Sequence, residues 1–227
     1  MTIEENNQNI GAKPALTEKE GGTFDYIVNC MKDAAIPFQK ACSQPNLHYP
    51  LNENKFTQMY VEQVEVKIKS HPNIGVKNQY SDIFMGTKGV PDFYFHKVEE
   101  GVHHFPLFVV ESKILPTPGE KREREYVIGN KENGAMERYK IEKHGKGFNV
   151  CGILGFVEKE TFDYWITSIN RWVEELSGTN DFWKKDEILT KIENKLDYFV
   201  SKSIAHRTSS QDISLYHLWI FTHKQKQ

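Results

Sequence analysis

The segment GVPDFYFHKVEEGVHHFPLFVVESK, residues 89–113, constrains the fold more than any other part of the chain. It contains two apolar runs, FYFHKV and FPLFVV, separated by residues that include Gly101. The second run is apolar at consecutive positions, as in a strand that is buried on both faces. Glycine between two such runs is typical of a turn. We therefore predict two neighbouring antiparallel strands that are joined near Gly101.

Charged side chains stand at the ends of these two runs. Asp92 begins the first run, and Glu111 and Lys113 end the second. Side chains two residues apart on a strand share a face, so Glu111 and Lys113 point the same way. If Glu100 and His103 pair across a two-residue turn, Asp92 lies directly opposite Glu111. A longer loop places Asp92 diagonally to Glu111, still within reach of a shared ion.

Two neighbouring carboxylates repel each other unless one is protonated or a cation lies between them. Oxygen ligands without a cysteine or histidine partner favour Mg²⁺, or Mn²⁺ as a substitute, over zinc. A lysine beside such a site orients the attacking water and stabilises charge on a phosphate. The pattern indicates metal-dependent phosphodiester hydrolysis. The structural alternative is a turn residue, Asp92 after Pro91, and an exposed ion pair between Glu111 and Lys113.

The surrounding sequence mixes helices and strands, which favours an α/β fold with a central mixed sheet. Residues 1–22 are polar and predict a disordered leader, followed by a single domain over residues 23–227. The charged, proline-containing segment 116–134 predicts a loop. Periodicity predicts helices that begin at the N-cap Thr23 and over residues 52–70, 135–145, 162–176 and 181–199, and strands over 150–157 and 213–221.

Composition narrows the class of protein. Hydrophobic residues make up 38% and charged residues 26% of the chain, as in a soluble globular protein. No apolar run approaches the ~20 residues of a membrane span, and no secretory signal is visible, which indicates a cytoplasmic protein. The spacing of Cys30, Cys42 and Cys151 predicts free thiols. A net charge of −2 does not indicate nucleic-acid binding, although a local basic face remains compatible with it.

The sequence Pro91-Asp92, followed by Glu111-Ser112-Lys113 at the end of an apolar strand, resembles the PD-(D/E)xK nuclease superfamily, which includes many type II restriction endonucleases. The resemblance covers about residues 52–157. It implies a restriction endonuclease-like fold, a three-layer α/β/α sandwich with a central mixed β-sheet. It also implies that Asp92, Glu111 and the backbone carbonyl of Ser112 bind the divalent ion, and that Lys113 positions the attacking water.

Members of this family often add a glutamate from the preceding helix. Of the three candidates, Glu53, Glu62 and Glu65, Glu53 extends the apolar stripe of that helix, whereas Glu62 lies on the opposite face and Glu65 to the side. We therefore predict that Glu53 assists at the metal. The alternative role of Glu53 is an acid that complements the dipole of the helix N-terminus.

Further residues follow from the same resemblance. Arg138, on a basic and aromatic helix, is predicted to contact phosphate or to orient the site, and His144 is a weaker candidate. His217, on the final strand, fits better as a hydrogen-bonded core histidine. Lysine and arginine near the site would supply phosphate affinity through counterion release. The candidates for substrate binding are Lys121, Arg122 and Arg124; the alternative for this segment is a solvated charged loop.

Together these features predict a Mg²⁺-dependent DNA endonuclease of restriction-enzyme type. The resemblance implies a homodimer that cuts both strands, since a two-fold axis matches the symmetry of the duplex. Two alternatives stay open: a catalytically inactive nucleic-acid-binding or protein-binding module that retains the nuclease fold, and a metal-free protein in which the charged residues form an ion-pair network. The sequence leaves the recognition site, the choice of DNA or RNA, and the role in restriction, phage defence or repair undetermined.

Overall fold

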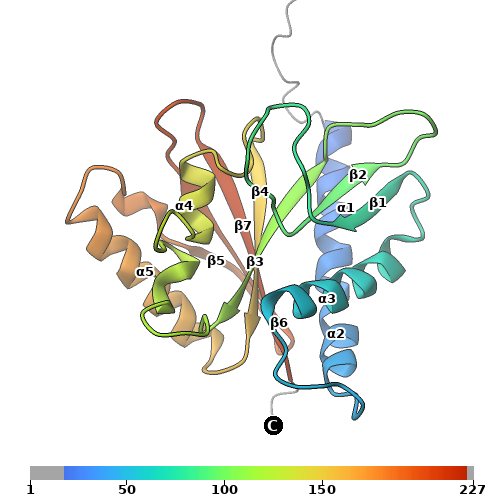
Figure 1. Ribbon diagram of the computed structural model, residues 1–227, viewed down its shortest axis with the longest axis horizontal. Coiled ribbons are helices and arrows are strands. Elements are labelled where there is room, and N and C mark those ends of the chain that lie inside the picture. Colours follow the sequence, from blue (N-terminus) through green and yellow to red (C-terminus); the bar gives the residue numbers. More distant parts are fainter. Residues whose placement is uncertain (1–17, 224–227) are drawn as a thin grey trace, which may run out of the picture.

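The computed structural model describes residues 18–223, which form an α/β fold around one seven-stranded mixed sheet (Figure 1). The strand order is β1-β2-β3-β4-β7-β6-β5. Strand β4 pairs in parallel with β3 and with β7, and the other pairs are antiparallel. The strands are β1 (Ile74–Asn78), β2 (Phe93–Lys97), β3 (Phe108–Leu115), β4 (Val150–Val157), β5 (Thr190–Asn194), β6 (Tyr198–Ala205) and β7 (Ile213–Phe221).

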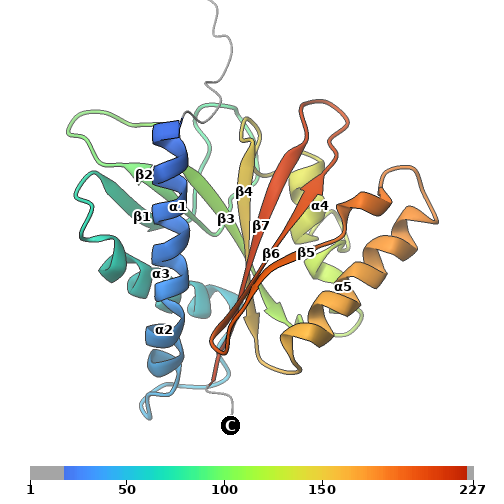
Figure 2. The same ribbon diagram turned by 180° about the vertical axis from the view of Figure 1, so that it is seen from behind.

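Helices cover both faces of the sheet. Helices α1 (Glu18–Asp33), α2 (Ala35–Cys42) and α3 (Glu53–Ile68) lie on one face, and Figure 2 shows α1 and α2 following one another along it. Helices α4 (Ala135–Lys140) and α5 (Phe162–Ser177) lie on the other face. Short 3₁₀ helices occur at η1 (Glu123–Tyr126) and η2 (Lys185–Glu187). Among residues 18–223, none of the helices combines the length and the apolar composition of a membrane-spanning segment.

Strand β3 is buried along its whole length, as the consecutive apolar residues predict. Phe108, Val110 and Ile114 belong to the core beneath α1–α3, whereas Val109 and Leu115 belong to the core beneath α4 and α5. The alternation of a β-strand therefore sends successive side chains into two separate cores. Glu111 and Lys113 consequently lie on the α4 side of the sheet.

An aromatic cluster attaches α2 and α3 to the sheet. The ring of Phe156 on β4 lies 5.2 Å from that of Phe38, 5.5 Å from that of Phe56 and 6.2 Å from that of Tyr60, measured between centroids. Edge-on and tilted ring pairs at such distances add to the stability from burial alone. The N-terminus of α3 is thereby fixed relative to β3 and β4.

The predicted pairing of β2 with β3, joined around Gly101, is confirmed, but the two-residue turn considered for this connection is not formed. Phe93 pairs with Val110 and Phe95 with Phe108, the register in which Asp92 falls opposite Glu111. Instead of a two-residue turn at Gly101, residues 98–107 form a long loop. Pro106 has no N–H group to donate to the hydrogen bonds between β2 and β3. Within the loop, the Glu99 carboxylate bonds to the His104 ring at 2.7 Å. Tight pairing beyond Phe95 is therefore replaced by loop contacts.

Other boundaries also differ from the predictions. Helix α1 begins at Glu18 rather than at Thr23, and the rest of the predicted leader, residues 1–17, lies outside the described residues. The helix predicted over residues 181–199 is wrong, because this stretch forms η2, β5 and the start of β6. The segment predicted as a polar loop contains η1, where Tyr126 and the following Val127 are fully buried. These two apolar residues anchor an otherwise charged segment to the core.

Candidate active site

The candidate site lies where β2 and β3 separate. Strand β2 pairs with Phe108, Val109 and Val110, whereas the part of β3 from Glu111 onward pairs with β4 alone. One edge of this half of β3 therefore lacks a neighbouring strand. Two carboxylates occupy the gap and accept hydrogen bonds from the strand backbone. Asp92 Oδ2 accepts from Ser112 N at 2.6 Å, and Glu53 Oε2 accepts from Ile114 N at 3.3 Å.

Glu53 reaches this edge because it opens helix α3. Asn52 is the N-cap, and its side chain accepts a hydrogen bond from Lys55 N at 3.0 Å. The second oxygen of Glu53, Oε1, accepts from Lys113 Nζ at 3.0 Å. Glu62 and Glu65 lie exposed further along the helix. Of the three predicted candidates, Glu53 is thus the one placed against β3.

Glu111 is a buried carboxylate surrounded by positive groups. Its side chain is 1% exposed, and Oε1 accepts from Lys113 Nζ at 3.2 Å and from Arg138 Nη1. Its other oxygen lies 3.1 Å from His144 Nδ1, without the alignment of a hydrogen bond. Burial alone would raise the pKa of Glu111, but Lys113, His144 and Arg138 lower it to about 2. Glu111 is therefore ionised.

Lys113 and Asp92 respond to the same charges in different ways. Burial opposes the charge of Lys113, yet Glu111, Glu53 and Asp92 raise its pKa above the usual value. Asp92 is partly buried, and desolvation followed by the charge of Glu111 raises its pKa well above the usual value, against the opposing effects of Lys113 and the Ser112 N–H. Burial and the charge of Glu111 therefore oppose ionisation of Asp92 more than Lys113 and the Ser112 N–H favour it.

Arg138 and His144 approach Glu111 from α4 and the loop that follows it. Arg138 Nη2 also donates to Asn133 Oδ1 at 3.2 Å, so its guanidinium is held from two sides. His144 is buried beside Gly89, where a Cβ would lie 2.2 Å from His144 Cδ2 and 2.0 Å from the carbonyl oxygen of Lys143. A glycine is therefore required for this close approach.

Two residues that the sequence did not single out shape this region. The sequence around Gly89 shows only that it precedes Val90-Pro91, and this does not indicate its contact with His144. Arg207 is buried and donates from its guanidinium to the carbonyl oxygens of Tyr139 at 2.9 Å, Gly145 at 2.8 Å and Phe148 at 3.3 Å. Because these carbonyls flank His144, Arg207 fixes the loop that carries this histidine.

The three basic residues predicted to bind substrate are spread along the segment after β3. Arg122 forms two bonds of 2.6 Å with the carboxylate of Glu125. Arg124 bonds to Glu175 at 2.5 Å and lies 6.0 Å from the ring centroid of Trp172. Lys121 is exposed and, with Arg124, lines an open hollow of about 580 Å³. Two of the three cations are thus engaged in ion pairs.

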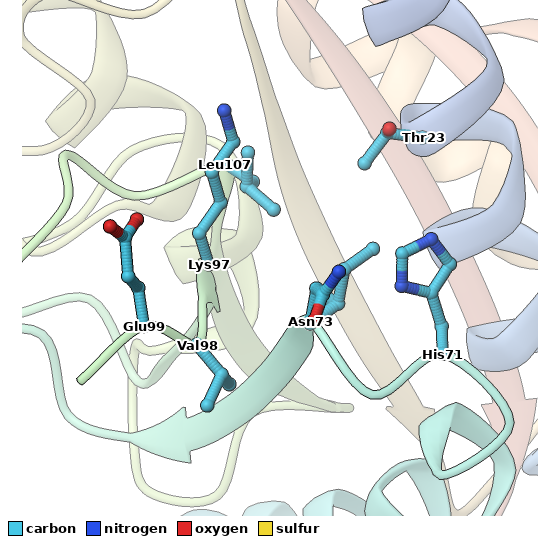
Figure 3. A pocket seen from close by; sticks show the side chains of 8 residues that line it. Thr23, His71, Asn73, Lys97, Val98, Glu99 and Leu107 are labelled. Carbon is cyan, nitrogen blue, oxygen red and sulfur yellow. The ribbon is translucent and has the colours of Figure 1, made fainter.

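A second hollow, of about 390 Å³, lies away from these residues. Figure 3 shows Lys97 and Glu99 on one side of it and Thr23 and His71 on the other. It opens between the start of α1, the turn before β1 and the loop after β2. None of the residues predicted for the site lines it.

His217 is a core residue, as predicted. It is fully buried, and its ring nitrogens bond to Tyr126 Oη at 2.8 Å and to Ser203 Oγ at 2.9 Å. The Tyr126 hydroxyl in turn accepts from Trp219 Nε1 at 2.7 Å. Burial lowers the pKa of His217 to about 3, so the ring is neutral and joins η1, β6 and β7.

The suitability of the site for a metal rests on its donor set. Within residues 18–223, no group of three or more histidine, cysteine, aspartate or glutamate side chains is arranged to hold a metal ion. Mg²⁺ needs fewer, because it commonly takes one or two protein carboxylates and completes its shell with water and substrate oxygens. Glu111 Oε2 is buried without a hydrogen-bond partner, and burial followed by the charge of Glu111 raises the pKa of Asp92. The carboxylates of Asp92 and Glu111 therefore suit Mg²⁺, and the backbone carbonyl of Ser112 is the further ligand that the sequence resemblance implies.

Comparison with protein-family models, with curated proteins and with solved structures finds no match for the chain. Asp92, Glu111, Lys113 and Glu53 are therefore the residues from which a function can be inferred.

Proposed function

We propose that the protein is a Mg²⁺-dependent DNA endonuclease with a restriction endonuclease-like fold of the PD-(D/E)xK type. The observation that carries the proposal is the convergence of Asp92, Glu111, Lys113 and Glu53 at the open edge of β3. The order of elements supports it: α3 precedes an antiparallel β1-β2-β3 sheet, and β4 then joins β3 in parallel. Helices on both faces of a mixed sheet are also what the resemblance implies, a three-layer α/β/α sandwich.

In the proposed enzyme Asp92 and Glu111 hold the metal with the carbonyl of Ser112. A bound Mg²⁺ would neutralise the two carboxylates, activate a water and stabilise the charge that grows on the phosphate. Arg138 and His144 hold Glu111 from the α4 side, so the carboxylate does not have to reorganise when substrate arrives. They are positioning residues in this scheme.

Lys113 acts as a hydrogen-bond donor. Its raised pKa means that Nζ keeps its proton at neutral pH, so it orients the attacking water and steadies phosphate oxygens without removing a proton itself. Glu53 holds Nζ in place from the other side at 3.0 Å and assists at the metal. Lys121, Arg122 and Arg124 follow β3 along the chain and are the proposed contacts to the DNA backbone.

A second candidate function is favoured by one observation. The ion pairs of Lys113 with Glu53 and Glu111, and of Arg138 with Glu111, satisfy most of the charges without any metal. The same arrangement would serve a catalytically inactive nucleic-acid-binding or protein-binding module.

Cleavage of supercoiled plasmid separates the two candidates. We expect the wild-type protein to nick or linearise plasmid with Mg²⁺ or Mn²⁺ and to lose this activity in EDTA. Asp92→Asn and Lys113→Ala should each lose about 10²-fold or more, since each removes a charge that the transition state needs. Asp163→Asn and Lys159→Ala, at exposed positions on and beside α5, are matched controls with wild-type activity expected.

Circular dichroism of each variant separates lost chemistry from lost fold. If wild type and site variants cleave equally, the activity belongs to a contaminant and the proposal fails. It also fails if the wild type is inert on duplex, single-stranded and branched DNA with either metal. A homodimer in solution, and localisation in the cytoplasm, are further expectations of the same proposal.

A further inference from the structure

The loop between β1 and β2, residues 79–92, presents apolar side chains to solvent. Ile83 is 67% exposed and Phe84 44% exposed. The loop is nevertheless tightly organised by Asp82, whose carboxylate accepts from the N–H of Phe84 and of Met85, each at 2.9 Å, and from Thr87 N at 3.0 Å. An exposed apolar tip on a fixed loop indicates a contact surface, because burial in the fold does not account for it.

Phe84 is part of a row of aromatic rings that comes from three loops. Its ring lies parallel to that of His103, at 5.6 Å between centroids and an angle of 10°. Phe105 meets Phe84 edge-on at 5.5 Å and stacks on Phe148 at 4.6 Å. Phe148 is buried, whereas Phe84 and His103 are exposed. The row therefore runs from the core to a flat, solvent-facing end.

The same loops carry the candidate site. At the base of the first loop, Gln79 N donates to the carbonyl oxygen of Asp92 at 2.7 Å. Gly89, in the same loop, packs against His144, which contacts Glu111. In Figure 1 this loop is the green segment that passes in front of β4. The exposed rings are thus attached to the backbone that positions Asp92 and His144.

We propose that Phe84 and His103 stack on an unpaired base of the nucleic-acid substrate. This inference rests on the proposed nuclease function and deepens it: the substrate class is single-stranded or locally unpaired nucleic acid. A parallel ring pair with an exposed end offers a planar surface that a base can extend, and base faces are accessible only where they are not stacked in a duplex.

The charges around the rings favour contact through a base over contact along a phosphate backbone. Glu99 and Glu100 stand in the loop that carries His103, and they would repel a backbone that followed this loop. Lys88 and Lys146, both exposed, lie in the two other loops of the row. Each loop therefore supplies a cation that could contact a phosphate next to the stacked base.

Binding of a fluorescently labelled single-stranded oligonucleotide, in Ca²⁺ to prevent cleavage, tests the proposal. We expect tighter binding to the single strand than to a duplex of the same sequence. Phe84→Ala should weaken binding to the single strand about ten-fold, and Phe84→Leu, which keeps an apolar side chain but no ring, should weaken it similarly. Tyr164→Ala, at an aromatic residue of α5 that is 49% exposed, is the matched control and should leave affinity unchanged.

Phe84→Trp provides an independent readout. It should retain affinity, and its fluorescence should be quenched when the single strand binds, because a base then covers the indole. The native tryptophans do not interfere, since each is at most 5% exposed; they are Trp165, Trp172, Trp183 and Trp219.

The outcomes distinguish this inference from the proposed function. If the wild type cleaves DNA but Phe84→Ala binds single strands as well as Tyr164→Ala does, the stacking proposal is overturned and the nuclease proposal stands. Preferential binding to intact duplex also overturns it. If the wild type neither binds nor cleaves any nucleic acid, both proposals fail, and the exposed rings become a candidate contact for another protein.

Discussion

Glu111 shows how one residue combines a structural and a functional role. Its side chain is 1% exposed, and its carboxylate forms ion pairs with Lys113 and Arg138. We predict that Glu111→Gln destabilises the fold by about 3–5 kcal/mol, because it leaves Lys113 without one of its partners inside the protein. Urea denaturation measures the loss, with Glu62→Gln on the exposed face of α3 as control. A loss below about 1 kcal/mol would mean that solvent reaches the pair.

The shared face of Glu111 and Lys113 was predictable because side chains alternate along a strand, whereas a glutamate from α3 was expected from the family resemblance and spacing only selected Glu53. Glu111 and Lys113 share a face by that rule, and Glu53 continues the buried stripe of α3. The roles of Gly89 and Arg207 could not be predicted in this way, since their partners lie far away in the sequence. Arg207 bonds to carbonyls more than fifty residues earlier, and no local pattern reports such a contact.

At the level of strands and helices, buried patterns were informative and exposed ones were not. The pairing of β2 with β3 was predicted correctly, and the structure has one of the two registers that were considered, the one with Asp92 opposite Glu111, although a long loop replaces the two-residue turn. Strand β5 is exposed at most positions and lacks such a pattern. Its charged residues fit a helical period equally well, and the predicted helix over residues 181–199 failed there.

The hydrogen-bonded chain through His217 should make stability depend on pH. The pKa of His217 is about 3 in the folded protein and about 6.5 in the unfolded chain. Between these pH values the imidazole is protonated in the unfolded chain but neutral in the folded protein. The contribution is fully present above pH ~6.5 and is lost as pH falls towards 3, by about 2 kcal/mol at pH ~5.

Denaturation at several pH values, for wild type and His217→Gln, measures this effect. The variant should be less stable at neutral pH but should show a shallower slope between pH ~6.5 and ~4, since it lacks the titrating ring. His48→Gln, at an exposed histidine, is the control and should keep the wild-type slope. Equal slopes in wild type and His217→Gln would contradict the prediction.

The whole molecule consists of two cores that share one sheet. The core beneath α1–α3 holds the Phe156 cluster, whereas the core beneath α4 and α5 holds all four tryptophans. We predict one cooperative unfolding transition, in which tryptophan fluorescence and far-ultraviolet circular dichroism coincide. Phe156→Ala, although in the opposite core from the tryptophans, should shift both probes together by about 3–5 kcal/mol. Two separated transitions would show that the faces of the sheet unfold independently.

The open edge of β3 has a consequence for how variants behave in solution. The carboxylates of Asp92 and Glu53 accept hydrogen bonds from the N–H groups of Ser112 and Ile114. In a continuous sheet a neighbouring strand would accept these bonds. Where the N–H groups of an edge strand lack hydrogen-bond acceptors, a strand of another polypeptide can pair with that edge. Removing both acids by alanine would expose such an edge and promote aggregation. Asparagine and glutamine, which keep a carbonyl acceptor, are therefore the substitutions that leave the protein monodisperse while removing its charge.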